Sequence, residues 1–198
     1  MHTLSEQQIR EFLRTKPDRR NQIGQVFEDF TNSIIPELKE IKNNGCKKKN
    51  NVYQLCDATI LSAANDITRK YNTKLGLLWE KIASLSPNVL SPELDFGASY
   101  KIPEVDVIVL YKKSLYYVQL KTQKNTLTGS QSSRTVEGLT TYKNHWFVAC
   151  IENDCSSTIP KVLNKLIGRQ FWDKIGIDYD TEILPNLKNS VMKVENLL

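Results

Sequence analysis

The centre of the chain contains two short runs rich in β-branched and aromatic residues, separated by a polar turn. The runs are 105–111 and 115–121, and the turn between them is Lys112-Lys113-Ser114. Runs of this length and composition around a polar turn are typical of a β-hairpin. A third run, 146–152, has the same character. The middle of the chain therefore has to form a β-sheet.

The segments on either side of these strands repeat apolar residues every three or four positions, which predicts helices. The predicted helices are 22–42, 52–72, 75–85 and 159–171, followed by a helical tail from Tyr179. Pro36 is expected to kink or restart the first helix. The polar stretch 42–51 is expected to be a loop, in which Lys47-Lys48-Lys49 is either solvated or in contact with phosphate.

Helices that precede and follow several strands predict one α/β domain over 1–198, with a central mixed β-sheet flanked by helices. Its expected parts are a helical N-terminal region over about 1–100, a sheet core over about 101–155 and C-terminal helices over about 159–198. We see neither an internal repeat nor an interior linker that would divide the chain.

Composition narrows the class of protein. Of the 198 residues, 40% are hydrophobic and 25% are charged, as in an ordinary globular domain. No apolar run approaches the roughly 18 residues that span a bilayer, and the polar start of the chain does not resemble a secretory signal. We therefore expect a cytoplasmic protein with no membrane partner. The net charge of +5 is compatible with a polyanionic partner without requiring one.

Cysteine and histidine chemistry is not favoured. The cysteines are Cys46, Cys56, Cys150 and Cys155, and their spacing fits no common zinc motif. We expect free thiols rather than a structural zinc site or disulfides. The two histidines, at positions 2 and 145, make a histidine-based catalytic triad unpromising.

Three polar residues of the hairpin form the strongest candidate for a chemical site. Gln119 and Lys121 lie two positions apart on one strand and therefore point to the same face. Asp106 joins that face if the hairpin register pairs it with Gln119, and a slip of one residue turns it away. Mg²⁺ prefers hard oxygen ligands such as carboxylate and amide oxygens, and a nearby lysine offsets negative charge on a phosphate. The pattern indicates a site for phosphodiester hydrolysis.

This pattern resembles the PD-(D/E)xK nuclease superfamily in its Q-x-K variant, and in particular the type II restriction endonucleases. Asn125-Thr126 and Gly129 follow Gln119-Leu-Lys121, as in the Q-x-K-S-G-x-N-T segment of such enzymes. Upstream, Gly76-Leu-Leu-Trp79-Glu80 is similar to their G-x-x-W-E helix. Downstream, Gly168-Arg-Gln-Phe-Trp172 before Ile175-Gly176 is similar to their G-x-x-F-W-x-x-I-x-G stretch. The matches span about 76–176.

The resemblance implies a restriction-endonuclease-like fold, Mg²⁺ as cofactor, cleavage of double-stranded DNA to 5′-phosphate ends, and a homodimer that reads a short palindrome. It implies that Asp106 and Gln119 bind the metal, that Lys121 is the catalytic lysine and that Glu80 is the helix acid of the site. Two features depart from the family pattern. The proline, Pro103, stands three residues before the aspartate, and Gln119 is neutral, so that Glu104 is a candidate for the missing charge.

The stretch after the second strand of the hairpin is expected to face the DNA, because its side chains bond phosphates and base edges. The candidate DNA-binding residues are Lys124, Asn125, Thr126, Thr128, Gln131, Ser133 and Arg134. Structural alternatives stay open: Asp106 as a strand cap, Lys121 as an edge lysine, and Arg134 as a loop arginine paired with Glu137. Trp79, Phe171 and Trp172 are expected to be core anchors.

Three other functions remain. The first is a non-catalytic DNA-binding module with a nuclease-like fold, which the neutral Gln119 keeps open. The second is a repair or junction-resolving nuclease with the same core. The third is a protein-interaction domain, which would make the basic excess and the Gln119-Leu-Lys121 strand coincidental.

Overall fold

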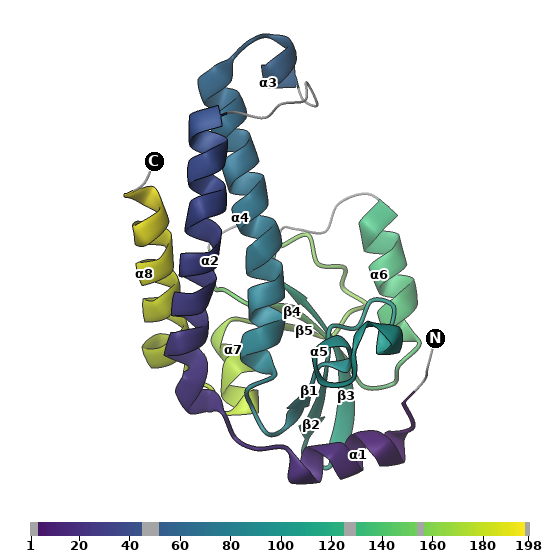
Figure 1. The fold of residues 1–198 in the computed structure, drawn as a ribbon. Helices are drawn as coiled ribbons and strands as arrows, with labels where there is room; N and C mark the ends of the chain where they lie inside the picture. The colour runs from purple at the N-terminus through teal and green to yellow at the C-terminus, as the bar shows by residue number, and fades with distance from the viewer. Residues whose placement is uncertain (1–3, 45–51, 125–129, 154–156, 197–198) are drawn as a thin grey trace.

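The computed structural model describes residues 4–44, 52–124, 130–153 and 157–196 (Figure 1). They form an α/β domain around a five-stranded mixed sheet of order β1-β2-β3-β4-β5. The strands are β1 (Val89–Leu90), β2 (Val107–Tyr111), β3 (Ser114–Lys121), β4 (His145–Ala149) and β5 (Lys165–Ile167). β1, β2 and β3 pair antiparallel, whereas β3, β4 and β5 pair parallel. The predicted α/β class with a central mixed sheet is confirmed.

The predicted hairpin is also confirmed, with a shorter turn than expected. Tyr111 pairs with Ser114, so that only Lys112 and Lys113 form the turn. Both lysines have positive φ angles, 48° and 68°, which is the backbone geometry that lets a two-residue turn follow the twist of its strands.

Helices cover both faces of the sheet (Figure 1). They are α1 (Glu6–Thr15), α2 (Ile23–Asn44), α3 (Val52–Leu55), α4 (Thr59–Ala83), α5 (Pro92–Phe96), α6 (Ser130–Thr140), α7 (Arg169–Trp172) and α8 (Leu184–Glu195). In Figure 1, α2 and α4 run side by side as a long pair that extends past the sheet, with α8 against α2, while α6 lies across the sheet from that pair. A π-helical turn, Tyr179–Ile183, leads into α8, which confirms the predicted helical tail.

Alternation along the strands divides the core into two layers. One layer packs against α2 and α4 and includes Val107, Val109, Val118, Leu120, Trp146 and Val148. The other packs against α1 and α6 and includes Ile108, Leu115 and Phe147. Trp79, Phe171 and Trp172 are fully buried in the first layer, as expected of core anchors.

The helical half of the chain differs from the sequence expectation in three places. Instead of two helices over 52–72 and 75–85, the structure has the short α3 and one long α4 that runs through both segments. Residues 42–44 of the predicted loop continue α2, and Lys47–Lys49 lie outside the described residues. Pro36 lies inside α2 without ending it. Ile34 and Leu38 on either side of Pro36 are buried, and their packing offsets the lost hydrogen bond.

The predicted helix over 159–171 is wrong. Residues 165–167 form β5, parallel to β4, and the helix α7 begins only after Gly168. Gly168 has a φ angle of +47°, a backbone conformation that breaks a continuing helix and that other residues rarely adopt. The third predicted strand is confirmed over its first part, since β4 ends at Ala149.

Among the helices that the structure describes, none is both long and apolar enough to cross a membrane. Of the cysteines, Cys56 is exposed and Cys150 is buried, and both are free thiols as expected. Cys46 and Cys155 lie outside the described residues.

Candidate functional site

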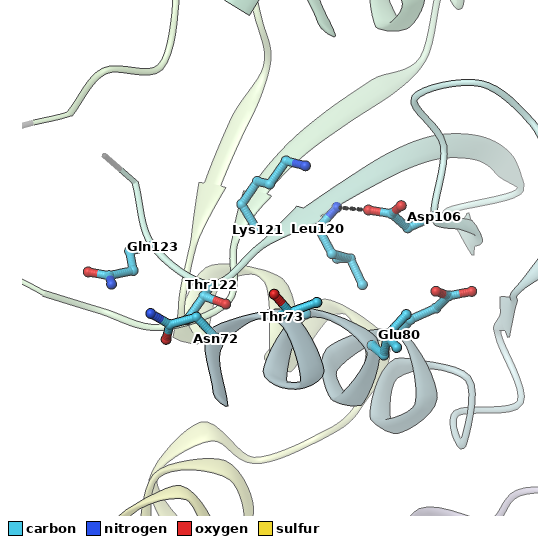
Figure 2. Close-up of a pocket in the computed structure, with 10 residues that line it drawn as sticks. Asn72, Thr73, Glu80, Asp106, Leu120, Lys121, Thr122 and Gln123 are labelled. Atoms are coloured by element: carbon cyan, nitrogen blue, oxygen red, sulfur yellow. Dashed lines mark hydrogen bonds between the residues drawn. The ribbon is translucent and has the colours of Figure 1, made fainter. Parts of the chain in front are cut away.

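Two cavities meet at the end of the β2–β3 hairpin that lies away from its turn. One, of about 390 Å³, lies between α4 and the end of β3, and the other, of about 260 Å³, lies between residues 101–106, β3 and α6. Asp106 and Lys121 line both cavities, while Gln119 lines the second. The three residues that the sequence singled out therefore gather at one place. Figure 2 shows two of them, Asp106 and Lys121.

Asp106 leaves the strand ladder just before β2 begins. The register pairs Val107 with Val118, yet the backbone N–H of Asp106 also donates to the Val118 carbonyl, at 2.9 Å. The hairpin has the predicted register, in which Asp106 follows on opposite Gln119, but the ladder ends at Val107 and the chain bends at Asp106. Its carboxylate accepts the backbone N–H of Leu120 at 2.7 Å, as Figure 2 shows. Asp106 thus caps a strand and faces the cavities at once.

Burial raises the pKa of Asp106 above its usual value. The Leu120 hydrogen bond and the charges of Lys121 and Lys101 lower it, whereas the charge of Glu104 raises it further. Ionisation of the Asp106 carboxyl therefore costs free energy in the folded protein. A cation beside this carboxylate would recover that cost, because an opposite charge favours the ionised form.

Glu80 extends from α4 toward Asp106, as Figure 2 shows. Burial raises the pKa of Glu80, a hydrogen bond from the Ser91 hydroxyl lowers it, and the charge of Asp106 raises it. The structure therefore brings this predicted helix acid to the larger cavity. Ser91, the N-cap of α5, fixes its carboxylate and was not identified from the sequence.

Gln119 is almost fully buried, with 4% of its surface exposed. Its side-chain N–H donates to Glu104 Oε2 at 2.8 Å. A carboxylate only accepts hydrogen bonds, so this contact fixes which end of the amide faces Glu104. The amide oxygen is left buried with no hydrogen-bond partner among the described residues. A buried acceptor without a partner costs about 1–3 kcal/mol, which a bound cation would offset. The Gln119 oxygen is therefore an acceptor that the described residues leave unused beside the cavity, although it is shielded from the cavity's solvent.

Glu104 holds this part of the site together, a role that the sequence did not reveal. Besides the Gln119 contact, it accepts a hydrogen bond from the Thr135 hydroxyl at 2.9 Å and forms an ion pair with Arg134 Nε at 2.8 Å. Burial alone would raise the pKa of Glu104, but the hydrogen bonds from Gln119 and Thr135 and the charges of Arg134 and Lys121 lower it. The carboxylate is therefore ionised and already paired. It does not stand free as a substitute for the missing acid.

The backbone around Glu104 is unusual as well. Its φ angle is +58°, in a region that residues other than glycine rarely adopt. Gly138 of α6 lies directly against it, since a Cβ at position 138 would come within 2.8 Å of Glu104 Cγ. Strained backbone of this kind persists only where surrounding contacts hold it. The only sequence signal was an acid two positions before Asp106.

Of the candidate DNA-binding residues, Arg134 lines the smaller cavity, Lys124 and Ser133 lie elsewhere on the surface, and the others lie outside the description. Arg134 lies on α6 rather than in a loop, pairs with Glu104 instead of Glu137, and keeps 72% of its side chain exposed. Ser133 is exposed on the same helix, and Lys124 is half-buried just after β3. Asn125, Thr126 and Thr128 lie outside the described residues, as does the side chain of Gln131.

Within the described part of the chain, no three His, Cys, Asp or Glu side chains lie close enough together to hold a metal ion by themselves. Asp106 and Gln119 would supply one carboxylate and one amide oxygen. Mg²⁺ accepts such a small protein contribution, because it keeps several waters and takes further oxygens from a phosphate. In comparisons with known proteins, no family model matches the chain and no curated protein matches it.

Proposed function

We propose that this protein is a Mg²⁺-dependent endonuclease of duplex DNA, of the type II restriction kind, with a restriction-endonuclease-like fold. The observation that carries the proposal is the gathering of Asp106, Gln119 and Lys121 around one cavity, with the amide oxygen of Gln119 lacking a partner among the described residues. A polar strand end that costs folding free energy is typical of a functional site.

Each residue has a distinct task in this proposal. Asp106 and Gln119 would hold Mg²⁺, which when bound lowers the pKa of a water and offsets charge on the phosphate. Lys121 lines both cavities, and its ammonium would offset the negative charge that develops on the phosphate oxygens. Glu104 keeps the Gln119 amide in one orientation. Glu80 adds a carboxylate from the α4 side.

Cleavage of both strands at a palindrome needs two such sites related by two-fold symmetry, so the proposal includes a homodimer. It also includes a cytoplasmic location and products that carry 5′-phosphates.

Digestion of phage DNA by the purified chain tests the reaction class. With Mg²⁺ we expect discrete fragments that DNA ligase rejoins without prior treatment, because their ends carry 5′-phosphate and 3′-hydroxyl groups. With EDTA in place of Mg²⁺ we expect intact DNA. A smear would indicate cutting without sequence specificity, and cleavage confined to branched junctions would indicate a junction-resolving nuclease.

A second candidate is a DNA-binding module without catalysis. Two observations favour it. Gln119 is neutral, and two acids of the smaller cavity's described lining already have ion pairs, Glu104 with Arg134 and Glu93 with Lys101. Asp106 is thus the one acid of that described lining without such a pair. Tight DNA binding in EDTA, together with no cleavage in either Mg²⁺ or Mn²⁺, would support this function over the first.

A further inference from the structure

The two cavities that share Asp106 and Lys121 differ in chemistry. Around the larger one, the described lining residues include one cation, Lys121, which belongs to the shared boundary. Around the smaller one they include two more, Lys101 and Arg134, whose side chains are 61% and 72% exposed. Each of these two cations is paired with an acid of the same cavity, Lys101 with Glu93 and Arg134 with Glu104, but both side chains are exposed enough to contact phosphate oxygens as well.

The larger cavity has the mixed surface that a nucleoside needs. Leu77 of α4 borders it with 63% of its surface exposed, which adds an apolar patch to the cavity wall. Asn72 and Gln123 contribute amide groups to the same wall, and Figure 2 shows both at one end of it. An apolar face flanked by a few amides matches a sugar and a base, which present apolar surfaces and hydrogen-bonding edges.

Gly76 keeps this cavity open. A Cβ built at position 76 meets no atom within 4 Å, so the helix surface there is bare rather than packed against a neighbour. Glycine inside a helix lowers helix stability relative to alanine. Gly76 therefore leaves open space along the wall of a cavity that Asp106 also lines.

We propose that the α4-side cavity is a nucleoside subsite. It receives the sugar and base next to the scissile phosphate, while the phosphodiester chain continues along the α6 side past Lys101 and Arg134. This inference rests on the proposed endonuclease function and adds the direction in which the substrate lies across the Asp106–Lys121 pair.

Gly76→Trp tests the subsite, because a Cβ at this position meets no atom within 4 Å and the added ring would take up space along the cavity wall. We expect at least a tenfold loss of plasmid cleavage in Mg²⁺, with thermal unfolding close to that of the natural chain. The matched control is Lys81→Trp, which adds the same ring at an exposed position of α4 outside the cavity and leaves cleavage unchanged.

Salt dependence distinguishes the two sides. In EDTA, Arg134→Ala should reduce the slope of log affinity against log salt by about 1, since one phosphate contact is lost. Gly76→Trp should weaken DNA binding with an unchanged slope. Full cleavage by Gly76→Trp, or a slope reduced as in Arg134→Ala, would overturn the subsite while leaving the endonuclease proposal intact. Absence of cleavage by the natural chain would instead overturn the endonuclease proposal, and the subsite with it.

Discussion

At the turn end of the β2–β3 hairpin, aromatic rings pack on one another and lysines lie over them, whereas at the open end polar groups remain partly unmatched. Trp146 stacks on Tyr116 with ring centroids 4.1 Å apart, and Tyr111 meets the edge of Trp146 at 5.7 Å. Lys112 lies over the Tyr111 ring at 5.4 Å. The turn end thus gains stability from ordinary packing.

The open end, formed by Glu104, Asp106, Gln119 and Lys121, has the opposite character. Glu104 has a positive φ angle, the pKa of Asp106 is raised, and the Gln119 oxygen lacks a partner within the described chain. One hairpin therefore carries packing at one end and unfavourable polar burial at the other. Such local costs are expected at sites that bind or react.

The largest effect on stability should come from the turn end. Trp146 is 7% exposed, and Trp146→Ala should lower the free energy of unfolding by about 3–5 kcal/mol through lost burial and a cavity. Urea denaturation measures this change. Lys112→Ala, also at the turn end but exposed, should stay within about 0.5 kcal/mol. A loss below 1 kcal/mol for Trp146→Ala would show that the stacked rings do not anchor the sheet.

Lys121→Ala should have its main effect on reaction rate. Removing a charge that stabilises the transition state typically lowers the rate by about 10²–10³-fold, or about 3–4 kcal/mol. The half-buried ammonium contributes little packing, so we expect an almost unchanged unfolding curve. Initial rates of plasmid cleavage give the comparison. Cleavage within twofold of the natural rate would remove Lys121 from the catalytic group.

Gly138→Ala probes the strained backbone of the open end. The added methyl group would lie 2.8 Å from Glu104 Cγ, so either α6 or Glu104 has to shift. Overpacking of this kind costs about 1–3 kcal/mol, and it should also raise the Mg²⁺ concentration needed for cleavage, because Glu104 orients Gln119. Stability and Mg²⁺ dependence both equal to those of the natural chain would show that Glu104 positions nothing.

Asp106→Asn should stabilise the protein at neutral pH. Because the pKa of Asp106 is raised in the folded state, the folded chain binds this proton more tightly than the unfolded chain. Stability of the natural chain therefore falls as pH rises above about 4, the unfolded value, up to the raised folded pKa. Asparagine does not ionise, so the gain should grow over that range and then level off.

Thermal unfolding across pH 4–8 measures this gain. Each kcal/mol corresponds to about 2–4 °C for a chain of this size. If Asp106→Asn melted at a lower temperature than the natural chain at pH 7, the ionised Asp106 carboxylate would not be destabilising the folded protein.

Features set by local pattern could be predicted from the sequence. The hairpin follows from alternation and a polar turn, and burial of Trp79 and Trp172 follows from their apolar helix faces. The helix predicted over 159–171 is wrong at its end. Leu166 and Ile167 fit a helical period, but they pair with β4 and form a strand. A parallel edge strand depends on a distant partner, which local spacing does not contain.

In the candidate site, too, local pattern predicts some features, whereas others depend on distant parts of the chain. Strand parity placed Gln119 and Lys121 on one face, and both line the smaller cavity with Asp106. The Glu104 contacts with Arg134 and Thr135 could not be predicted, because they require α6 to fold back over the hairpin end and the chain to adopt a positive φ angle. The structural alternative that paired Arg134 with Glu137 is accordingly wrong, because Arg134 pairs with Glu104.

Plasmid cleavage in Mg²⁺ by the natural chain and by Asp106→Asn, at equal concentration and with matching circular dichroism spectra, addresses the metal–phosphate site most directly. Asparagine keeps an oxygen for the Leu120 N–H but removes the charge that would hold the ion. We predict cleavage by the natural chain and none by the variant. Equal cleavage by both proteins would contradict a site built on the Asp106 carboxylate.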